Sequence, residues 1–425
     1  MLQLYFIRDN KDYVIERLAI KNFDATELVE EIIRMDNDRR STQKKLDDNL
    51  ATSNQLSKEI GRLFKEGQRE EAEEVRKAST ELKAVVKDLE QSLNQIEKTL
   101  NEKLVELPNL PHKSVKAGRS ESDNEIVHEE GTLPVLPENA VPHWELASKY
   151  DIIDFDLGSK VTGAGFPFYK GKGARLQRAL INFFLDEALK NGYIEYQPPL
   201  LINEDSGFGT GQLPDKEGQM YYVGEDNLYL IPTAEVPITN IYRNVILKED
   251  ELPIKNVAYS NCFRREAGSY GKDVRGLNRL HQFDKVEIVQ IATPEKSYEV
   301  LEEMKAQVAE LLRKLELPFR ILRLCGGDVS FASALTYDFE VYSAAQKRWL
   351  EVSSVSNFEN FQANRMKLRY KSKEGKTTLA HTLNGSALAL PRIVAAMLEN
   401  NQTNNGINVP ELLRSYTGYE IIDSK

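Results

Sequence analysis

The sequence is poor in cysteine, has no excess of positive charge and contains no long apolar run. Its 425 residues include two cysteines, Cys262 and Cys325, which lie far apart and form no CxxC pair, as is typical of a reducing compartment. The net charge of −10 argues against a protein that holds nucleic acid through overall basicity, so any RNA contact must use local basic patches. The apolar run from Leu4 to Ile7 is too short for a signal peptide or a membrane span. We therefore expect a soluble, cytoplasmic protein with two or three domains.

Proline is absent between Thr26 and Leu107, and this stretch is rich in Glu, Lys, Gln, Leu and Ala, which favours long helices. Its second half carries two apolar series with a spacing of seven: Val75, Leu82, Leu89 and Ile96, and Val86, Leu93, Leu100 and Leu107. The first half carries a less regular stripe: Leu28, Ile32, Met35, Leu46, Leu50, Leu56, Ile60 and Leu63. These stripes of the a/d type, interrupted at Gly67, predict two helices that fold back into an antiparallel coiled-coil hairpin.

The heptad pattern is compatible with two alternative functions of the hairpin. Heptad helices most commonly form dimerisation coiled coils, whereas a hairpin that projects from a larger body can contact a large partner. Its faces carry many basic residues: Arg34, Arg39, Arg40, Lys44, Lys45, Arg62, Lys65, Arg69, Arg76 and Lys77. Because acidic residues are interleaved with them throughout, charge alone does not separate a solvated surface from an RNA-binding one.

The rest of the chain has a mixed pattern. Five prolines between Leu107 and Pro142 indicate an irregular linker. Beyond them, helical segments alternate with strand-like runs such as 227–231, 285–291 and 349–353. Because the strands follow one another without regular helical crossovers, we expect an α+β fold in which an antiparallel sheet is flanked by helices. The predicted domains are residues 1–107 with the hairpin, a linker at 108–142 and a catalytic domain at 143–425.

Common signatures of nucleotide binding and hydrolysis are missing. The sequence has no Walker loop, no Rossmann glycine pattern, no HExxH and no GxSxG. Three segments of another kind occur in order: 192–200 with a double proline, 262–287 with Phe263-Arg264-Arg265-Glu266, and Leu383 to Arg392. In this order and spacing they resemble motifs 1, 2 and 3 of the class II aminoacyl-tRNA synthetases.

Further segments narrow the resemblance: Thr233-Ala234-Glu235, the loop 268–277 and Glu351-Val352-Ser353-Ser354. Together with the hairpin, they resemble the bacterial type of the seryl-tRNA synthetase family over essentially the whole chain. The resemblance implies activation of L-serine with ATP to seryl-adenylate, then transfer to the 3′ end of tRNA(Ser), and of tRNA(Sec) where present. It also implies a homodimer formed through motif 1 at 193–200, no membrane partner, and a hairpin that contacts the long variable arm of serine tRNAs.

The chemistry of activation explains why arginines are expected at the site. The carboxylate of serine must approach the α-phosphate of ATP, so preorganised cations are needed to bring two anions together. A guanidinium spans carboxylate and phosphate oxygens, and the resemblance assigns this role to Arg264. It implies that Arg392 binds the γ-phosphate, that Glu266 binds the adenine amino group and that Phe283 stacks on adenine. The remaining residues expected at ATP are Arg265, Leu280, Glu351, Val352, Ser353 and Ser354, with Glu351 and Ser354 as ligands of Mg²⁺.

Serine poses a selectivity problem, because alanine and glycine fit wherever serine fits. A buried hydrogen-bond partner for the hydroxyl solves it, since leaving that partner unpaired costs a factor of about 10⁴ or more. The resemblance assigns this role to Glu287, although a glutamate in such a strand is ordinarily exposed. The other residues expected to bind serine are Thr233, Ala234, Glu235, Arg264, Asn384 and Ser386.

Two other interpretations stay open at this point. One is a class II relative that activates another small amino acid or loads a carrier protein, and the other is a catalytically silent scaffold. A silent relative would be expected to lose Arg264, Glu287 or Arg392, and this chain keeps all three. Its five scattered histidines and two distant cysteines make no zinc-ligand cluster, so we expect His281 and His381 to pack rather than to bind metal.

Overall fold

The computed structural model describes residues 1–266 and 275–423. It divides into two compact units. The hairpin unit comprises Met1–Ala19 and Phe23–Pro108, and the sheet unit comprises Ile20–Asn22 and Asn109–Lys425. The stretch 108–142, predicted as a linker, contains strand β1 (Glu125–Glu130), which pairs with β11 (Phe319–Arg323). The predicted domain boundaries themselves stay a prediction.

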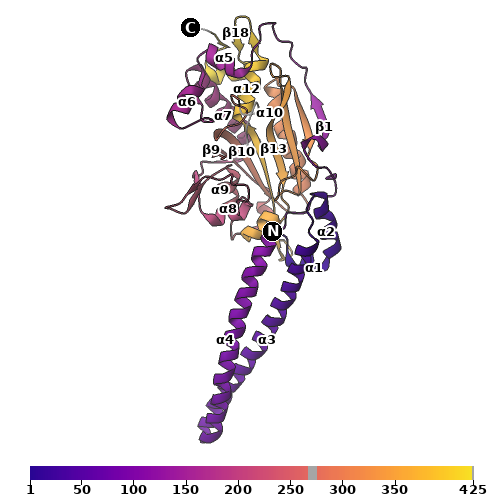
Figure 1. Ribbon diagram of the computed structural model, residues 1–425, viewed down its shortest axis with the longest axis vertical. Helices are drawn as coiled ribbons and strands as arrows, with labels where there is room; N and C mark the ends of the chain where they lie inside the picture. Colours follow the sequence, from indigo (N-terminus) through magenta and orange to yellow (C-terminus); the bar gives the residue numbers. More distant parts are fainter. Residues whose placement is uncertain (267–274, 424–425) are drawn as a thin grey trace. The chain divides into compact units, whose positions relative to one another are not determined.

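Two long helices form most of the hairpin unit. α3 (Thr26–Lys65) and α4 (Arg69–Glu106) lie side by side (Figure 1) and are joined by a short turn in which Gly67 has φ +79°. Glycine adopts such a φ without steric cost, which explains why the heptad pattern breaks there. Two short helices precede them: α1 (Leu4–Asp9) and α2 (Lys11–Ile20). The predicted antiparallel hairpin is confirmed.

The seam, meaning the buried and half-buried residues along the facing sides of α3 and α4, follows the predicted heptads closely on α4. Both predicted apolar series, one of which ends at Leu107 just after α4, are buried or half-buried. On α3, Leu50 is 39% exposed, so its predicted place in the stripe is wrong. Asp36 of α3 is buried, and its carboxylate pairs with Arg8 of α1 at 3.0 Å and with Arg39 at 2.8 Å. A buried carboxylate needs such partners, and this polar cluster explains why the first half of the pattern is irregular.

An eight-stranded sheet forms the centre of the sheet unit. Its strands, in order, are β1, β11, β12 (Leu335–Ser343), β13 (Arg348–Asn357), β16 (His381–Ala389), β10 (Gln282–Ala292), β9 (Ile254–Phe263) and β4 (Ile194–Tyr196). Neighbours are antiparallel except β4 and β9, which are parallel. Smaller sheets are made by β2 (Ile153–Asp154) with β3 (Phe168–Tyr169); by β5 (Leu201–Ile202), β7 (Leu228–Leu230) and β6 (Tyr222–Val223); by β8 (Ile246–Lys248), β14 (Arg369–Lys371) and β15 (Thr377–Leu379); and by β17 (Gln402–Thr403), β18 (Gly406–Asn408) and β19 (Ile421–Ile422).

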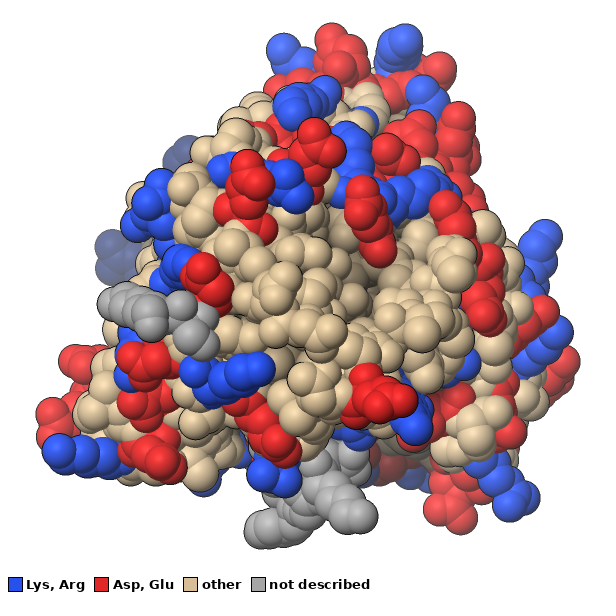
Figure 2. All heavy atoms as spheres, turned by 90° about the horizontal axis from the view of Figure 1, so that it is seen from above, with Lys and Arg blue, Asp and Glu red and all other residues tan. Residues whose placement is uncertain are grey.

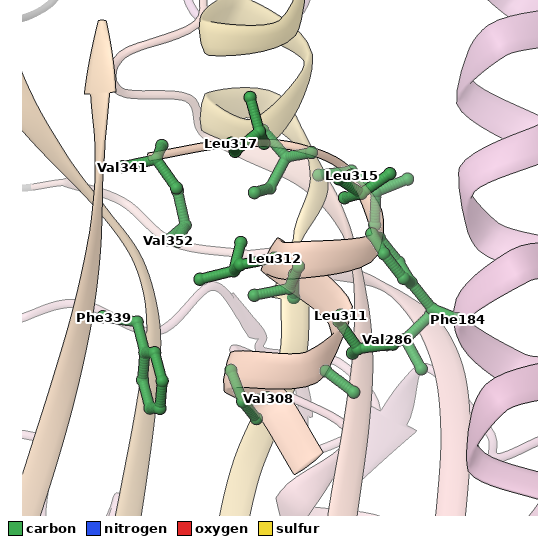
Figure 3. Close-up of a cluster of buried hydrophobic side chains, with 14 of the residues drawn as sticks. Phe184, Val286, Val308, Leu311, Leu312, Leu315, Leu317, Phe339, Val341 and Val352 are labelled. Atoms are coloured by element: carbon green, nitrogen blue, oxygen red, sulfur yellow. The ribbon is translucent and has the colours of Figure 1, made fainter. Parts of the chain in front are cut away.

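Helices pack on both faces of the central sheet (Figure 1), which confirms the predicted α+β fold. The helices described in the sheet unit are α5 (His143–Lys149), α6 (Phe155–Val161), α7 (Lys172–Lys190), α8 (Glu204–Thr210), α9 (Glu235–Asn240), α10 (Ser297–Lys314), α11 (Phe361–Met366), α12 (Leu390–Asn400) and α13 (Glu411–Thr417). The main core lies between the sheet and helices α7, α10 and α12. Figure 3 shows part of it, where Leu311 of α10 lies near Val286 of β10 and Phe184 of α7, and Leu312 lies on the side of Val352 of β13.

Side chains of β10 alternate between the two faces of the sheet, as they do in any strand. Val286 belongs to the main core, whereas Val289 packs with Ala234, at the start of α9, on the opposite face. By the same alternation, Lys285 and Glu287 lie on the α9 face. The first half of β10 therefore presents two charged side chains to the space next to α9.

Among the described residues, no helix is long and apolar enough to cross a membrane. Seen from above (Figure 2), Lys and Arg side chains are interspersed with Asp and Glu around a broad uncharged area. The two signs are mixed on this face, as expected for a chain of net charge −10 whose contacts with anions must be local.

Candidate active site

Glu287 lies inside the sheet unit, in the middle of β10. Its strand pairs with β9 on one side and with β16 on the other, so that Glu287 stands opposite Ala258 and Ser386. The residue is 1% exposed, in contrast to the exposed position that is usual for a glutamate in a strand. A buried carboxylate requires partners that donate hydrogen bonds or carry positive charge.

Lys285, two residues earlier on the same face of β10, is the charged partner of Glu287. Its Nζ lies 2.6 Å from Glu287 Oε2 and donates to Thr233 Oγ1 at 2.9 Å. Asn384 Nδ2 donates to Glu287 Oε1 at 3.0 Å, and the Ser386 hydroxyl donates to Oε2 at 3.4 Å. The structure thus brings four of the residues predicted for serine together and adds Lys285, which sequence reasoning missed. We call these five residues the serine cluster.

Glu235, the first residue of α9, is a second buried carboxylate. Gln362 Nε2 donates to Glu235 Oε1 at 2.7 Å, and the Thr382 hydroxyl donates to Gln362 Oε1 at 2.7 Å. Burial and then the nearby charge of Glu287 raise the pKa of Glu235 to about 7. Such a carboxyl favours a ligand that brings positive charge. The neighbouring Ala234 is fully buried, and Gln362 has no motif in the sequence that could have identified it.

Arg264 follows the end of β9 and lies over Phe283 of β10. Its guanidinium carbon is 5.2 Å from the centre of the Phe283 ring, within the range of a cation–π contact. Its backbone N–H donates to His281 O at 2.9 Å, and the His281 Nδ1 lies 3.1 Å from Arg264 O. These bonds fix the backbone that carries the guanidinium, which is the preorganisation expected of a cation that stabilises developing negative charge.

The two residues after Arg264 have partners of their own. The Arg265 guanidinium carbon lies 5.9 Å from the centre of the Tyr221 ring. Glu266 has φ +48° and forms an ion pair with Arg279 at 3.1 Å. Residues 267–274, which include most of the predicted motif 2 loop, lie outside the described residues.

Arg392 lies in the first turn of α12. Its Nε donates to Asn278 O at 2.9 Å, and its Nη1 donates to Glu351 O at 2.8 Å. The Glu351 carboxylate lies 3.7 Å from Nη1 and accepts from the Ser354 hydroxyl at 3.4 Å. The arginine predicted for the triphosphate and the residues predicted for Mg²⁺ are therefore neighbours.

Three other residues predicted at ATP have buried side chains. Leu280 and Val352 belong to the main hydrophobic core, and the Ser353 hydroxyl donates to Ser386 O at 2.6 Å. These side chains stabilise the sheet, so contacts with ATP at Val352 and Ser353 would have to come from the backbone.

Asp338 adds a further oxygen donor close to Glu351. It stands opposite Ser354 on the neighbouring strand β12, and its buried Oδ1 has no hydrogen-bond partner in the part of the chain that the structure describes. Burial and then the charge of Glu351 raise the pKa of Asp338 well above its usual value. The described residues contain no group of three or more His, Cys, Asp or Glu side chains that could hold a metal. The hard oxygen donors of Glu351, Ser354 and Asp338 nevertheless fit Mg²⁺, which keeps several of its waters.

Comparisons with known proteins cover the whole chain. A family model described as the seryl-tRNA synthetase N-terminal domain matches residues 1–111, and one described as the tRNA synthetase class II core domain (G, H, P, S and T) matches residues 221–401. The serine–tRNA ligase of Salinibacter ruber is 51% identical over 427 residues, with 100% of both chains covered. The chain belongs to the seryl-tRNA synthetase family.

Other seryl-tRNA synthetases also match this chain over nearly its whole length. The serine–tRNA ligase of Caldicellulosiruptor saccharolyticus is 50% identical, and the match covers 99% of this chain and 100% of that one. The Pyrococcus horikoshii seryl-tRNA synthetase, solved in complex with ATP, has a TM-score of 0.93 at 32% identity, with 100% of both chains covered. The Naegleria fowleri cytoplasmic serine–tRNA ligase, in complex with AMP, has a TM-score of 0.87 at 29% identity and covers 100% and 99% of the two chains. The predicted enzyme class, a serine–tRNA ligase, is confirmed.

The predicted motif 1 segment, 193–200, contains β4, which lies at one edge of the central sheet. β4 is the last strand of the sheet, and among the strands that the structure describes it pairs with β9. Its first residue, Ile194, is 59% exposed, and Leu201 nearby in the sequence is 40% exposed. Exposed apolar residues beside an open sheet edge favour coverage by another chain, and the homodimer stays a prediction.

Proposed function

We propose that the sheet unit activates L-serine with ATP to give seryl-adenylate and pyrophosphate, then transfers the seryl group to the 3′ end of tRNA(Ser), and of tRNA(Sec) where present. The observation that carries this proposal is the serine cluster around Glu287. Paired with Lys285, this carboxylate accepts a hydrogen bond from the serine hydroxyl in a site closed to water. Alanine and glycine, which have no hydroxyl, leave it unpaired, and this excludes them more strongly than size does.

The other groups of serine have partners in the same place. Glu235, with Thr233 beside it, binds the ammonium group, because a buried carboxyl gains most from a positive ligand. Arg264 binds the serine carboxylate and the α-phosphate together, and so holds the attacking oxygen in line with phosphorus. The attacking carboxylate is already ionised near neutral pH, so activation needs no protein base.

ATP is the second substrate in this proposal, and the relatives solved with ATP and AMP support it. Arg392 binds the γ-phosphate, while Phe283 and Glu266 bind the adenine. Glu351 and Ser354, with Asp338 beside them, would hold a Mg²⁺ ion, which neutralises phosphate charge when bound. Arg264 and Arg392 stabilise the charge on phosphorus and on the leaving pyrophosphate.

We infer that the chain works in the cytoplasm, as a homodimer whose contact includes the exposed apolar residues near β4. The hairpin unit binds the long variable arm of the tRNA, since a helical rod recognises RNA shape and backbone more readily than bases.

Pyrophosphate exchange across a panel of amino acids tests the proposal. We expect exchange with serine, and a kcat/KM for alanine and glycine that is lower by about 10⁴ or more. A better response to any other amino acid would overturn the assignment. Exchange with no amino acid at all would favour a silent scaffold.

The KM for serine is expected to rise as the pH falls below about 7. The pKa of Glu235 is raised to about 7, so this carboxyl is neutral below that pH and ionised above it. The serine ammonium stays charged over this range and binds the ionised form more strongly, so kcat/KM for serine falls by about tenfold per pH unit on the acid side. Exchange rates at saturating ATP between about pH 6 and 8.5 measure this.

Glu235→Gln is the matched control for the pH profile. The amide keeps the shape and the contact with Gln362 but has no proton to lose in this range. We expect a weaker affinity for serine and a flat profile. An equally steep acid fall in this variant would assign the titration to another group.

A further inference from the structure

His143 and Glu399 form a fully buried pair that the proposed chemistry does not use. His143 opens α5, Glu399 lies in the last turn of α12, and both side chains are 0% exposed. The backbone N–H of His143 donates to Glu399 Oε1 at 3.0 Å, and the ring nitrogen Nδ1 lies 2.8 Å from the same oxygen. Leu277 N–H donates to the other ring nitrogen, Nε2, at 2.8 Å. Because a backbone N–H can only donate, Nε2 carries no proton and the proton sits on Nδ1.

Glu399 holds the ring in this orientation. Its carboxylate also accepts from the Ser343 hydroxyl, from Gln346 Nε2 at 2.9 Å and from Gln346 N at 3.3 Å. Burial raises the pKa of Glu399, but the hydrogen bonds from His143 and Ser343 outweigh burial and lower it below its usual value. The ionised Glu399 carboxylate accepts the hydrogen bond from Nδ1–H. The other ring nitrogen, Nε2, is then unprotonated and accepts a hydrogen bond, as in other histidines that are oriented by a carboxylate.

Residues 275–277, at the end of the predicted motif 2 loop, pack closely against His143 and its neighbour Trp144. Gly276 has φ +68°, and a Cβ at this position would lie 2.2 Å from His143 Nε2, so a side chain is excluded there. The Arg275 guanidinium carbon lies 4.7 Å from the centre of the Trp144 ring, next to His143. Residues 275–277 therefore lie against the start of α5, where they meet Trp144 and His143.

The same segment leads to Arg392. Asn278 O accepts from Arg392 Nε at 2.9 Å, and Asn278 Nδ2 donates to Gln346 Oε1 at 3.0 Å. Both Arg392 and Glu399 belong to α12. Glu399 is therefore linked to His143, His143 to Leu277, and the next residue, Asn278, back to Arg392 by hydrogen bonds. Moving the segment moves an acceptor that fixes the arginine.

We propose that His143 is a positioning residue for ATP: through Nε2 it fastens the segment 275–278 to α12 and so orients Arg392. This inference rests on the proposed function, in which Arg392 binds the triphosphate. His143 touches no substrate and acts through Leu277 and Asn278. Its loss therefore impairs the use of ATP while the serine cluster keeps its geometry.

Two substitutions of His143 distinguish the role of Nε2 from the role of Nδ1. In His143→Gln the side-chain amide reaches the place of Nε2, so an acceptor for Leu277 N–H is kept. In His143→Asn the amide reaches only the place of Nδ1, so the contact with Glu399 is kept and the segment loses its acceptor. For His143→Asn we expect kcat/KM for ATP to fall by about 10- to 100-fold in serine-dependent exchange, because a buried N–H is left unpaired. We expect KM for serine to change by less than about threefold, and His143→Gln to stay within about threefold of wild type in both.

Limited digestion with trypsin gives a readout that needs no activity. Cleavage after Arg275, followed by mass spectrometry, is expected to be about tenfold faster in His143→Asn than in wild type or in His143→Gln. If cleavage rates and ATP kinetics are the same in both variants, or follow their melting temperatures, the proposal is wrong. Faster cleavage in His143→Asn with unchanged ATP kinetics would overturn the link to Arg392. A wild type that shows no serine-dependent exchange would overturn the proposed function, while the digestion still tests the role of His143.

Discussion

Shortening the hairpin is expected to abolish charging of tRNA(Ser) while serine-dependent pyrophosphate exchange stays within about threefold of the full-length value. All residues named for serine and ATP belong to the sheet unit, so the first step needs no part of the hairpin. Charging also requires that the enzyme bind the tRNA. The loss of several contacts with the phosphate backbone of the RNA weakens this binding by roughly 10³-fold or more. The measurement is exchange and aminoacylation with the same enzyme preparation.

The deletion is designed to keep the hairpin folded. Removing 40–63 together with 72–95 takes equal lengths from both helices, shortens the arm by roughly 36 Å and keeps the turn at Gly67. The cluster of Asp36 with Arg8 and Arg39 is retained, as is the ion pair between Glu31 and Lys103 at 3.2 Å. At the new junctions the half-buried Arg39 takes the place of the buried Leu63 before the turn, and the half-buried Ile96 takes the place of the buried Ala72 after it, so the turn stays attached to the buried sides of both helices.

A tRNA(Ser) with a shortened variable arm is the second half of this experiment. The full-length enzyme is expected to charge it poorly, and the shortened enzyme is expected to charge both tRNAs equally poorly, because the two changes remove one interaction. Equal loss of exchange and charging would contradict the division of labour between the units. Charging that survives the deletion would return the hairpin to the dimerisation coiled coil that the heptads alone allow.

The hairpin shows how far local patterns carry a prediction. The helix α4 and the turn at Gly67 were predicted because their signals, a heptad and a glycine, are local. The stripe of α3 was harder to predict, since a buried position of this helix is filled by Asp36 and one of its partners, Arg8, lies on another helix. The direction of Leu50 was also predicted wrongly. In an irregular stripe, no local pattern shows whether a leucine side chain faces the other helix or the solvent.

The site shows the same division between local and distant information. Motif resemblance selected Glu287 and Ser386, which are 99 residues apart, and the pairing of β10 with β16 joins them. Lys285 was missed although it lies two residues from Glu287, because its burial depends on α9 covering that face of the sheet. Gln362 and His143 were missed because each acts through a partner more than 100 residues away. Spacing along the chain contains no information of this kind.

Replacing Glu287 by alanine is expected to lower kcat/KM for serine by about 10⁴ in pyrophosphate exchange, the largest effect of any single substitution considered for this site. The serine hydroxyl would enter a buried site without an acceptor, and Lys285 would lose its counter-charge. The rate with alanine should change far less, because alanine makes no bond to Glu287. The ratio of the two rates, measured at saturating ATP, therefore reports specificity directly.

Loss of the counter-charge complicates this result, because breaking a buried ion pair costs about 3–5 kcal/mol and can unfold a variant. Glu287→Gln combined with Lys285→Met removes both charges and keeps the volume of each side chain, so its melting temperature is expected to stay close to that of wild type. If Glu287 serves mainly to balance Lys285, this double variant should activate serine almost normally. If Glu287 recognises the hydroxyl, the double variant folds and still loses at least about 10² in the serine-to-alanine ratio, because a neutral amide is a weaker acceptor than an ionised carboxylate. A ratio within tenfold of wild type in this well-folded variant would contradict the assignment of Glu287 as the residue that selects serine.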